Sequence, residues 1–338
     1  MTGSEEGTAS ETPNAEFRKL SPLPEFRPAF WLRGRHGQTI LPSLLPARPI
    51  RGRAETLDVP VAPGSAVRVL LHKPAHPIGT LVLLHGLGGS AESGYMRRTG
   101  ALALARGWAV ARVNLRTCGG TEALASTLYN AGQSDDAGAV LAALDRRGLP
   151  RPYGLVGFSL GGNIALKYAG MAGGSCLADA IVGVNPPVDL AACIAALERP
   201  SNRLYHAYFT RKLWTQLKRL RRVRDVPGPR RIPRGVRGFD DAFTAPDAGY
   251  ASAADYYAGA SAGPRLAAVA RPALVLSSDD DPFVPVGAFE PFRAGARRVV
   301  FAHPRGGGHC GYWRAARPRY WAGEAALSFM DDVLTRGA

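Results

Sequence analysis

The sequence of 338 residues is 46% hydrophobic and 20% charged, which permits a large buried core and excludes extensive disorder. No apolar stretch approaches the ~18 residues of a membrane span, and the four cysteines lack the spacing of metal ligands. The formal net charge of +15 is distributed unevenly along the chain. From this composition we expect a cytoplasmic protein with reduced thiols, holding neither a metal nor an organic cofactor.

The beginning of the chain differs in composition from the rest. Residues 1–14 lack the basic start and the apolar core of a signal peptide. We interpret them as part of a disordered tail over residues 1–23, and we expect residues 24–338 to form a single domain.

Candidate strands and helices alternate along most of that domain. Near-continuous apolar strands separated by helices predict an α/β fold with a mostly parallel sheet covered on both faces. The first two strands alternate in polarity and lie in tandem, so we expect an antiparallel start. The expected strands are 55–61, 66–74, 80–85, 108–115, 153–158, 180–185, 273–278 and 298–303, and the helices lie near 93–106, 132–147, 160–172 and 322–335.

One long interruption, at about residues 190–262, separates two of the later strands and predicts a helical cap inserted over the sheet. From Arg199 to Arg237 the chain carries thirteen Arg or Lys against one acid, Asp225. Apolar residues recur there at helical spacing, which predicts a basic amphipathic helix with one apolar side, formed by Tyr208, Leu213, Trp214, Leu217 and Leu220.

The basic helix has three interpretations. First, its charged face is solvated and keeps the protein soluble. Second, it attracts an anionic membrane surface or an acidic substrate. Third, it contacts nucleic acid. Nucleic acid is the least favoured, because the sequence contains no zinc finger, recognition-helix signature or aromatic RNA-binding motif.

The pattern Gly-x-Ser-x-Gly occurs twice, centred on Ser159 and on Ser261. Ser159 lies between Gly157 and Gly161, with an apolar strand before it and a long helical pattern after it, which is the context of a nucleophile elbow. The flanking glycines leave room for the crossing backbone, and the helix N-terminus favours a developing oxyanion. Ser261 has no strand before it and runs into Pro264, so we interpret it as structural.

A serine nucleophile requires a histidine base and an acid that follow it in the order acid, then histidine. His309 lies in the glycine-rich stretch "RGGGHCGYW" and is the predicted base, whereas His303 ends a strand and is interpreted as structural. Three adjacent aspartates, Asp279, Asp280 and Asp281, directly follow the expected strand 273–278. Asp281 is preferred because the turn containing Pro282 and Pro285 begins there, and Asp280 and Asp279 are interpreted as loop-capping residues.

An oxyanion hole requires two backbone N–H donors. The Leu160 amide, directly after the nucleophile, is one candidate. The stretch "LLHGLGG" supplies the other, Leu87, because a strand ends there and the chain turns sharply beside glycines. We interpret His85 as a structural residue of this turn.

Together these motifs resemble the YheT-like branch of the α/β-hydrolases, which includes plant embryogenesis-associated proteins and membrane-anchored animal members that act on phospholipids with medium-length acyl chains. The resemblance runs from about residue 24 to the C-terminus and implies Ser159, Asp281 and His309 as catalytic residues. It is carried by "FRPAFWLRGRHGQTILPSLL", "HGLGGSAESGYMRRTGALALARGWAVARVNLRTCGGT", "LYNAGQSDD", "GFSLGGNIALKYAG", "VNPPVDL", "DDDPF" and "GGHCGYW".

The sequence departs from that family at a few positions. Asn130 stands where a histidine is common, and Gly37 stands where a larger residue is usual. Neither position belongs to the expected triad. No membrane-anchoring segment precedes residue 24, so membrane location is not inherited from the animal members.

We therefore expect a serine carboxylesterase that cleaves short- to medium-chain acyl esters, lipid esters among them, through an acyl-enzyme. The expected partner is a small-molecule ester, with peripheral contact to an anionic membrane through the basic cap. An acyltransferase or a thioesterase would use the same triad. A non-catalytic ligand-binding protein of this fold is disfavoured because all three catalytic positions are filled.

Overall fold

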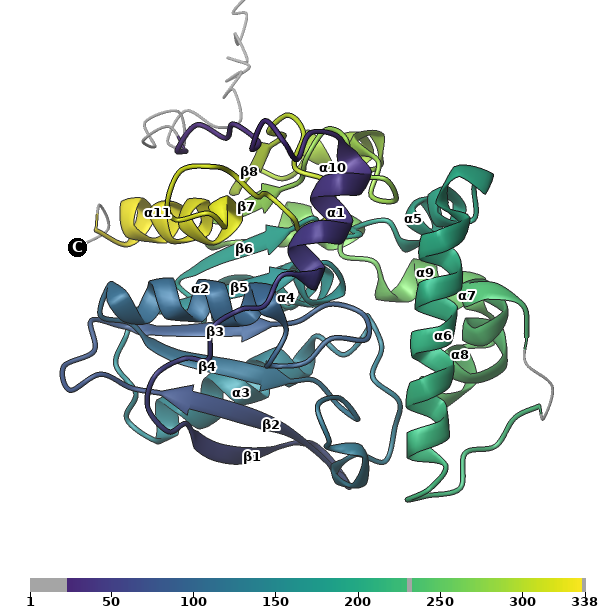
Figure 1. The fold of residues 1–338 in the computed structure, drawn as a ribbon. Coiled ribbons are helices and arrows are strands. Elements are labelled where there is room, and N and C mark those ends of the chain that lie inside the picture. The colour runs from purple at the N-terminus through teal and green to yellow at the C-terminus, as the bar shows by residue number, and fades with distance from the viewer. Residues whose placement is uncertain (1–22, 230–232, 336–338) are drawn as a thin grey trace, which may run out of the picture.

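A computed structural model describes residues 23–229 and 233–335, and almost all of the expected N-terminal tail lies outside these residues. The eight expected strands are present and form one sheet in the order β1-β2-β4-β3-β5-β6-β7-β8 (Figure 1). The strands are β1 (Glu55–Ala62), β2 (Ser65–His72), β3 (Thr80–Leu84), β4 (Ala109–Asn114), β5 (Tyr153–Phe158), β6 (Ala180–Val184), β7 (Ala273–Leu276) and β8 (Val299–Ala302).

The sheet is antiparallel at its beginning and parallel afterwards, as expected. β1 pairs with β2 and β2 with β4 in antiparallel register, and all the other pairs are parallel. Every residue of β3, β5 and β6 is buried, because helices cover both faces of the sheet there. The carboxyl ends of these parallel strands meet at one edge, where α/β folds bind their ligands.

The two faces of the sheet carry separate apolar cores. Leu81 and Leu83 of β3 pack with Met96 of α2 and with α11, whereas Val82 and Leu84 point the other way and join the core of α3 and α4. The helices outside the cap are α1 (Arg35–Leu44), α2 (Gly94–Ala105), α3 (Asp135–Arg146), α4 (Leu160–Ala172), α10 (Glu290–Arg293) and α11 (Trp321–Thr335), with short turns η2 (Glu122–Leu124), η3 (Gly173–Ser175), η6 (Gly263–Ala268) and η7 (Val286–Phe289).

The segment between β6 and β7 forms a helical cap beside the carboxyl ends of the strands (Figure 1). Asn163 of α4 ties it to the core, since its side chain donates to Ala260 O at 2.9 Å and accepts from Ala262 N at 2.8 Å. The cap comprises α5 (Leu190–Leu197), η4 (Pro200–Asn202), α6 (Arg203–Leu220), α7 (Gly235–Phe239), the π-helical turn η5 (Asp240–Thr244), α8 (Ala245–Asp247) and α9 (Ala253–Ala260).

The amphipathic helix of the cap is α6, with one correction to the expected pattern. Its buried side packs Trp214 against Phe239 and Phe243, at ring-centroid distances of 5.6 and 5.5 Å. Tyr208 was expected on this side but is 53% exposed. It lies on another flank of the helix, where its ring contacts Phe209. The apolar side therefore consists of the remaining expected residues, Leu213, Trp214, Leu217 and Leu220.

Within residues 23–229 and 233–335, none of the helices combines the length and the apolarity that crossing a bilayer requires.

Candidate active site

Ser159 occupies the sharp turn between β5 and α4. Its backbone angles of φ 52° and ψ −122° lie in a region that side chains rarely adopt, so surrounding structure must hold this conformation. The two flanking glycines make the turn possible. A Cβ on Gly157 would lie 2.0 Å from Gly161 O, and a Cβ on Gly161 would lie 2.5 Å from Leu84 O.

The side chains of Ser159, His309 and Asp281 form one hydrogen-bonded chain. His309 Nδ1 lies 2.7 Å from Asp281 Oδ2, and His309 Nε2 lies 2.9 Å from Ser159 Oγ. Because the carboxylate can only accept, Nδ1 carries the imidazole proton and Nε2 accepts from the serine hydroxyl. Asp281 follows β7 and His309 follows β8, so neighbouring parallel strands deliver both residues to the edge where β5 delivers Ser159.

The pKa of His309 reflects two opposing effects. Burial lowers it, because the charged imidazolium is poorly solvated, but the charge and hydrogen bond of Asp281, together with those of the neighbouring Cys310, raise it more strongly. The net result is a pKa above the usual value of 6.5. The pair therefore stabilises the imidazolium that forms when the base takes a proton.

The carboxylate of Asp281 is held by donors on both oxygens. The backbone amides of Phe283 and Val284 donate to Oδ1 at 3.0 and 2.9 Å. The side-chain amide of Asn185 donates to Oδ2 at 2.6 Å. Oδ2 is also the oxygen that accepts from His309, so Asn185 fixes the atom that orients the imidazole.

Two backbone amides near Ser159 are free to stabilise an oxyanion. Neither the Leu87 N–H nor the Leu160 N–H has an acceptor among the described residues. The amides on either side of Leu87 are occupied, since Gly86 N donates to Tyr95 Oη at 3.0 Å and Gly88 N donates to Tyr129 Oη at 2.5 Å. These two bonds fix the loop and leave the Leu87 amide available.

Comparisons with known proteins identify the family of the chain. A family model described as the alpha/beta hydrolase fold matches residues 79–316. The Escherichia coli (strain K12) protein named "Putative esterase YheT" is 32% identical over 308 residues, which cover 87% of this chain and 88% of that protein. The chain belongs to the YheT-like family of α/β-hydrolases. This hydrolase is of the esterase or lipase type.

Two further comparisons extend this result. The hydrolase is 28% identical to human "Phospholipase ABHD3" over 309 residues, which cover 87% of the chain and 75% of that protein. Among solved structures, Est1E from Butyrivibrio proteoclasticus superposes with a TM-score of 0.56, covering 83% of the hydrolase and 99% of Est1E. Its sequence identity is 14%, so this likeness concerns the fold.

The other serine and histidine candidates of the hydrolase have structural contacts. Ser261 is buried, donates to Tyr257 O at 2.6 Å and accepts from Leu190 N at 3.0 Å, so it links two cap helices. His85 accepts from Leu115 N, and its other ring nitrogen donates to Gly86 O at 2.8 Å. Burial lowers its pKa to about 4. His303 Nδ1 lies 3.0 Å from Ser277 O.

The two aspartates beside Asp281 hold the loop that carries the base. Asp279 accepts from Gly306 N at 3.0 Å, and Asp280 accepts from Gly308 N at 2.8 Å. Asp279 and Asp280 were expected to cap a loop, and the loop that they cap is the one that carries His309. Asn130 accepts from Gly132 N within its own turn and makes no hydrogen bond to the Ser159–His309–Asp281 chain.

From the sequence we did not identify the hydrogen bonds by which Gln38 and Thr39 of α1 hold the loop that carries His309. We call this set of bonds the clamp. Gln38 is fully buried, donates to Leu32 O and Trp313 O at 2.9 Å each, and accepts from Trp313 N at 2.7 Å. Thr39 Oγ1 accepts from His309 N at 2.9 Å. The available signal was a polar pair, Gln and Thr, inside an otherwise apolar and basic segment.

Asn185, Tyr95 and Tyr129 were also missed as site residues. Asn185 directly follows a buried strand at the ligand-binding edge of the sheet, which is a usable signal. Tyr95 and Tyr129 carry no such signal, because their hydroxyls reach the loop that contains Leu87 only in the folded chain.

Aromatic side chains line one wall beside the base. The Phe283 ring lies 4.1 Å from the His309 ring, centroid to centroid. Tyr205 and Phe209 of α6 contact Phe283 at 5.4 and 5.6 Å. The first turns of α6 thus give the site an apolar wall.

Proposed function

We propose that the protein hydrolyses carboxylic esters with Ser159 as nucleophile and His309 as general base. His309 Nε2 takes the hydroxyl proton while Ser159 Oγ attacks the ester carbonyl. Asp281 keeps the imidazole in the required tautomer and stabilises the imidazolium. The observation that carries the proposal is the chain of two hydrogen bonds from Asp281 through His309 to Ser159.

The remaining steps use the same groups. The Leu87 and Leu160 amides stabilise the tetrahedral oxyanion, and the imidazolium returns the proton to the leaving alcohol. A water molecule, deprotonated by His309, then attacks the acyl-serine and releases the acid, regenerating Ser159.

The proposed substrates are esters of short- to medium-chain acyl groups, including lipid esters. The aromatic wall of Phe283, Phe209 and Tyr205 favours an apolar acyl chain, since its burial beside these rings removes apolar surface from water. The names of two relatives, an esterase and a phospholipase, agree with this class.

Fluorophosphonate labelling tests the nucleophile. We expect wild type to be labelled and to hydrolyse p-nitrophenyl butyrate, and Ser159→Ala to do neither. Ser261→Ala is the matched control, because it removes the serine of the second Gly-x-Ser-x-Gly motif and should retain both properties. A Ser159→Ala protein that keeps full labelling and turnover would sink the proposal, as would an unreactive wild type.

A series of aryl esters tests the substrate class. We expect kcat/KM to reach a maximum at an acyl length between acetyl and decanoyl, because each added methylene that is buried contributes about 0.8 kcal/mol until the pocket is filled. Equal kcat/KM values across the series would contradict a defined acyl pocket.

A further inference from the structure

The outer edge of α6 is exposed and changes character along its length. Leu204 and Tyr208 at its beginning are 73% and 53% exposed, which is unusual for large apolar side chains. Basic residues continue the same exposed edge toward the end of the helix. We use the name α6 ridge for this edge together with Arg222, which lies just beyond the helix. The ridge is formed by Leu204, Tyr208, Arg211, Thr215, Lys218, Arg219 and Arg222.

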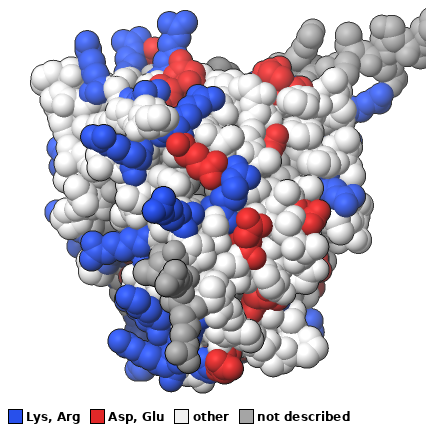
Figure 2. Space-filling model, turned by 90° about the vertical axis from the view of Figure 1, so that its right-hand side faces the viewer, with Lys and Arg blue, Asp and Glu red and all other residues white. Residues whose placement is uncertain are grey.

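Within residues 23–229 and 233–335, the positive charge of the α6 ridge is not neutralised by ion pairs. None of Arg211, Lys218, Arg219 and Arg222 forms an ion pair with a residue in the described part of the chain. Figure 2 shows Lys and Arg concentrated along the left and lower parts of the cap face, with fewer in its middle and at its right. Asp and Glu lie mostly in its middle and right, with some at the top and bottom (Figure 2). Such a one-sided field attracts an extended anionic surface.

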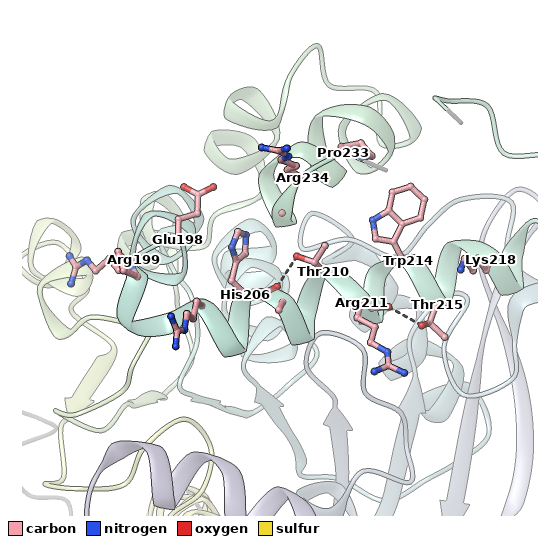
Figure 3. Close-up of a pocket in the computed structure, with 14 residues that line it drawn as sticks. Glu198, Arg199, His206, Thr210, Arg211, Trp214, Thr215, Lys218, Pro233 and Arg234 are labelled. Atoms are coloured by element: carbon pink, nitrogen blue, oxygen red, sulfur yellow. Dashed lines mark hydrogen bonds between the residues drawn. The ribbon is translucent and has the colours of Figure 1, made fainter. Parts of the chain in front are cut away.

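A groove of about 810 Å³ runs along the side of α6 next to the ridge. Figure 3 shows Arg199 near one end and Lys218 near the other, with Trp214 and Arg234 facing the space between. Glu198 is the acidic residue that lines the groove, and its carboxylate accepts a hydrogen bond from the Arg237 guanidinium at 2.9 Å. The groove therefore presents cations that form no ion pair in the part of the chain that the structure describes, and such cations are suited to phosphate groups.

Exposed apolar residues also occur on α1, close to the catalytic base. His36 Nδ1 lies 3.0 Å from Tyr205 Oη, so α1 begins beside α6. One and two turns further along the same helix face, Ile40 and Leu44 are 43% and 72% exposed. Ile40 directly follows Thr39, which binds the His309 amide, so the exposed face of α1 begins near the loop that carries His309.

We propose that the α6 ridge and the exposed face of α1 dock onto an anionic lipid bilayer. Ile40, Leu44, Leu204 and Tyr208 enter the boundary of the acyl chains, and the basic end of the ridge with its groove binds lipid phosphates. Nucleic acid is less well matched, because its backbone offers the aliphatic side chains of Ile40, Leu44 and Leu204 no apolar partner. The proposal does not depend on the proposed activity, since docking requires no catalysis.

Vesicle sedimentation tests the docking surface, with Ser159→Ala measured beside wild type. We expect both proteins to bind vesicles of phosphatidylcholine containing about one third phosphatidylglycerol, but not phosphatidylcholine alone. Raising NaCl from about 50 to about 500 mM should release them, because salt screens charge–charge attraction. Since each basic residue near an anionic membrane contributes roughly fivefold to partitioning, Arg211→Gln/Arg219→Gln should bind roughly 30-fold more weakly.

Two further variants make the test specific. Arg146→Gln/Arg297→Gln removes the same charge from exposed positions near the opposite edge of the sheet, and it should bind like wild type. Leu204→Ser tests apolar insertion and should weaken binding at low salt without a change in charge. Melting temperatures show whether each variant is folded.

Three outcomes would overturn the proposal. They are no binding to the anionic vesicles, equal losses in both double variants, or vesicle binding that a short DNA duplex abolishes while Leu204→Ser has no effect. An inactive wild type that still docks would count against the proposed activity alone, and an active wild type that does not dock would count against docking alone.

Discussion

His309 is the residue whose protonation controls the proposed reaction. The base must be neutral to accept the serine proton, and Asp281 raises its pKa above 6.5 against the effect of burial. We therefore expect kcat/KM to fall as pH decreases, with a midpoint above 6.5. The pH dependence of kcat/KM for a soluble aryl ester measures this midpoint directly.

Asp281→Asn serves as the control for that profile. It removes the negative charge and leaves the burial, so the midpoint should move to lower pH while the rate falls by about 10⁴-fold. A midpoint identical to that of wild type would show that Asp281 does not set the pKa of His309.

Asn185 positions the carboxylate rather than reacting. Its amide donates to Asp281 Oδ2 and to Gly308 O, and its oxygen accepts from Cys310 N. We expect Asn185→Ala to lower kcat/KM by roughly 10- to 100-fold, the effect of losing one hydrogen bond to a charged group. The midpoint of the pH profile should rise, because the Asp281 charge then acts more strongly on His309.

Asn163→Ala is the matched control for Asn185→Ala. Asn163 is also a fully buried asparagine with three hydrogen bonds, but its partners are backbone groups of Ala131, Ala260 and Ala262. Both variants should lose stability, which thermal unfolding measures. If both shift the pH midpoint equally, the role assigned to Asn185 is wrong.

At this scale the sequence predicts the residues that follow strands. Ser159, Asp281 and His309 were identifiable because parallel strands place their carboxyl ends together, so short motifs after strands converge in space. Tyr95, Tyr129 and the pairing of Gln38 with Trp313 were not identifiable. Each of these contacts joins segments that only the folded chain brings together, and no local pattern encodes such a contact.

At the scale of elements, the cap contains a buried acid that makes its stability depend on pH. Burial raises the pKa of Asp240 to about 6, although Tyr257 donates to its Oδ2 at 2.7 Å. Between about pH 4 and pH 6 the folded protein thus holds a proton that the unfolded chain has lost, so stability decreases as pH rises through this window.

Asp240→Asn should remove most of that dependence, because the amide oxygen still accepts from Tyr257 and carries no charge. We expect the variant to exceed wild type in free energy of unfolding by about 3 kcal/mol near pH 8, and to differ little near pH 4. Denaturant unfolding at both values measures this difference. Asp225→Asn, at an exposed acid of the cap, should behave like wild type, and an equal gain there would refute the burial argument.

The elements themselves were predictable to different degrees. Continuous apolar runs identify the buried strands, because a strand that is covered on both faces is apolar at nearly every position. Tyr208 of α6 was placed wrongly because helical spacing alone does not say how wide the buried side is. Helix α1 has no counterpart among the expected helices. Pro42 within it interrupts the helical sequence pattern, and Ile40 and Leu44 face outward.

For the whole molecule, the sequence predicts an excess of positive charge but not the part of the surface on which that charge lies. The basic residues of the cap are close together in the chain, yet helix geometry decides that Arg211 and Arg219 extend an exposed edge while Trp214 faces inward. Sheet topology similarly decides that the cap lies beside the carboxyl ends of the strands, near Ser159 (Figure 1). Both properties follow from long-range packing, which requires the three-dimensional structure.

The clamp between Gln38 and Trp313 joins positions 275 residues apart. During synthesis, α1 emerges from the ribosome early, and its partner emerges only when most of the chain has been made. The loop that carries His309 has no support from α1 until then, so a nascent chain holds Ser159 long before it holds a positioned base. Such distant contacts make folding slow. Reactivity of this serine should therefore be among the last properties that the newly made chain acquires.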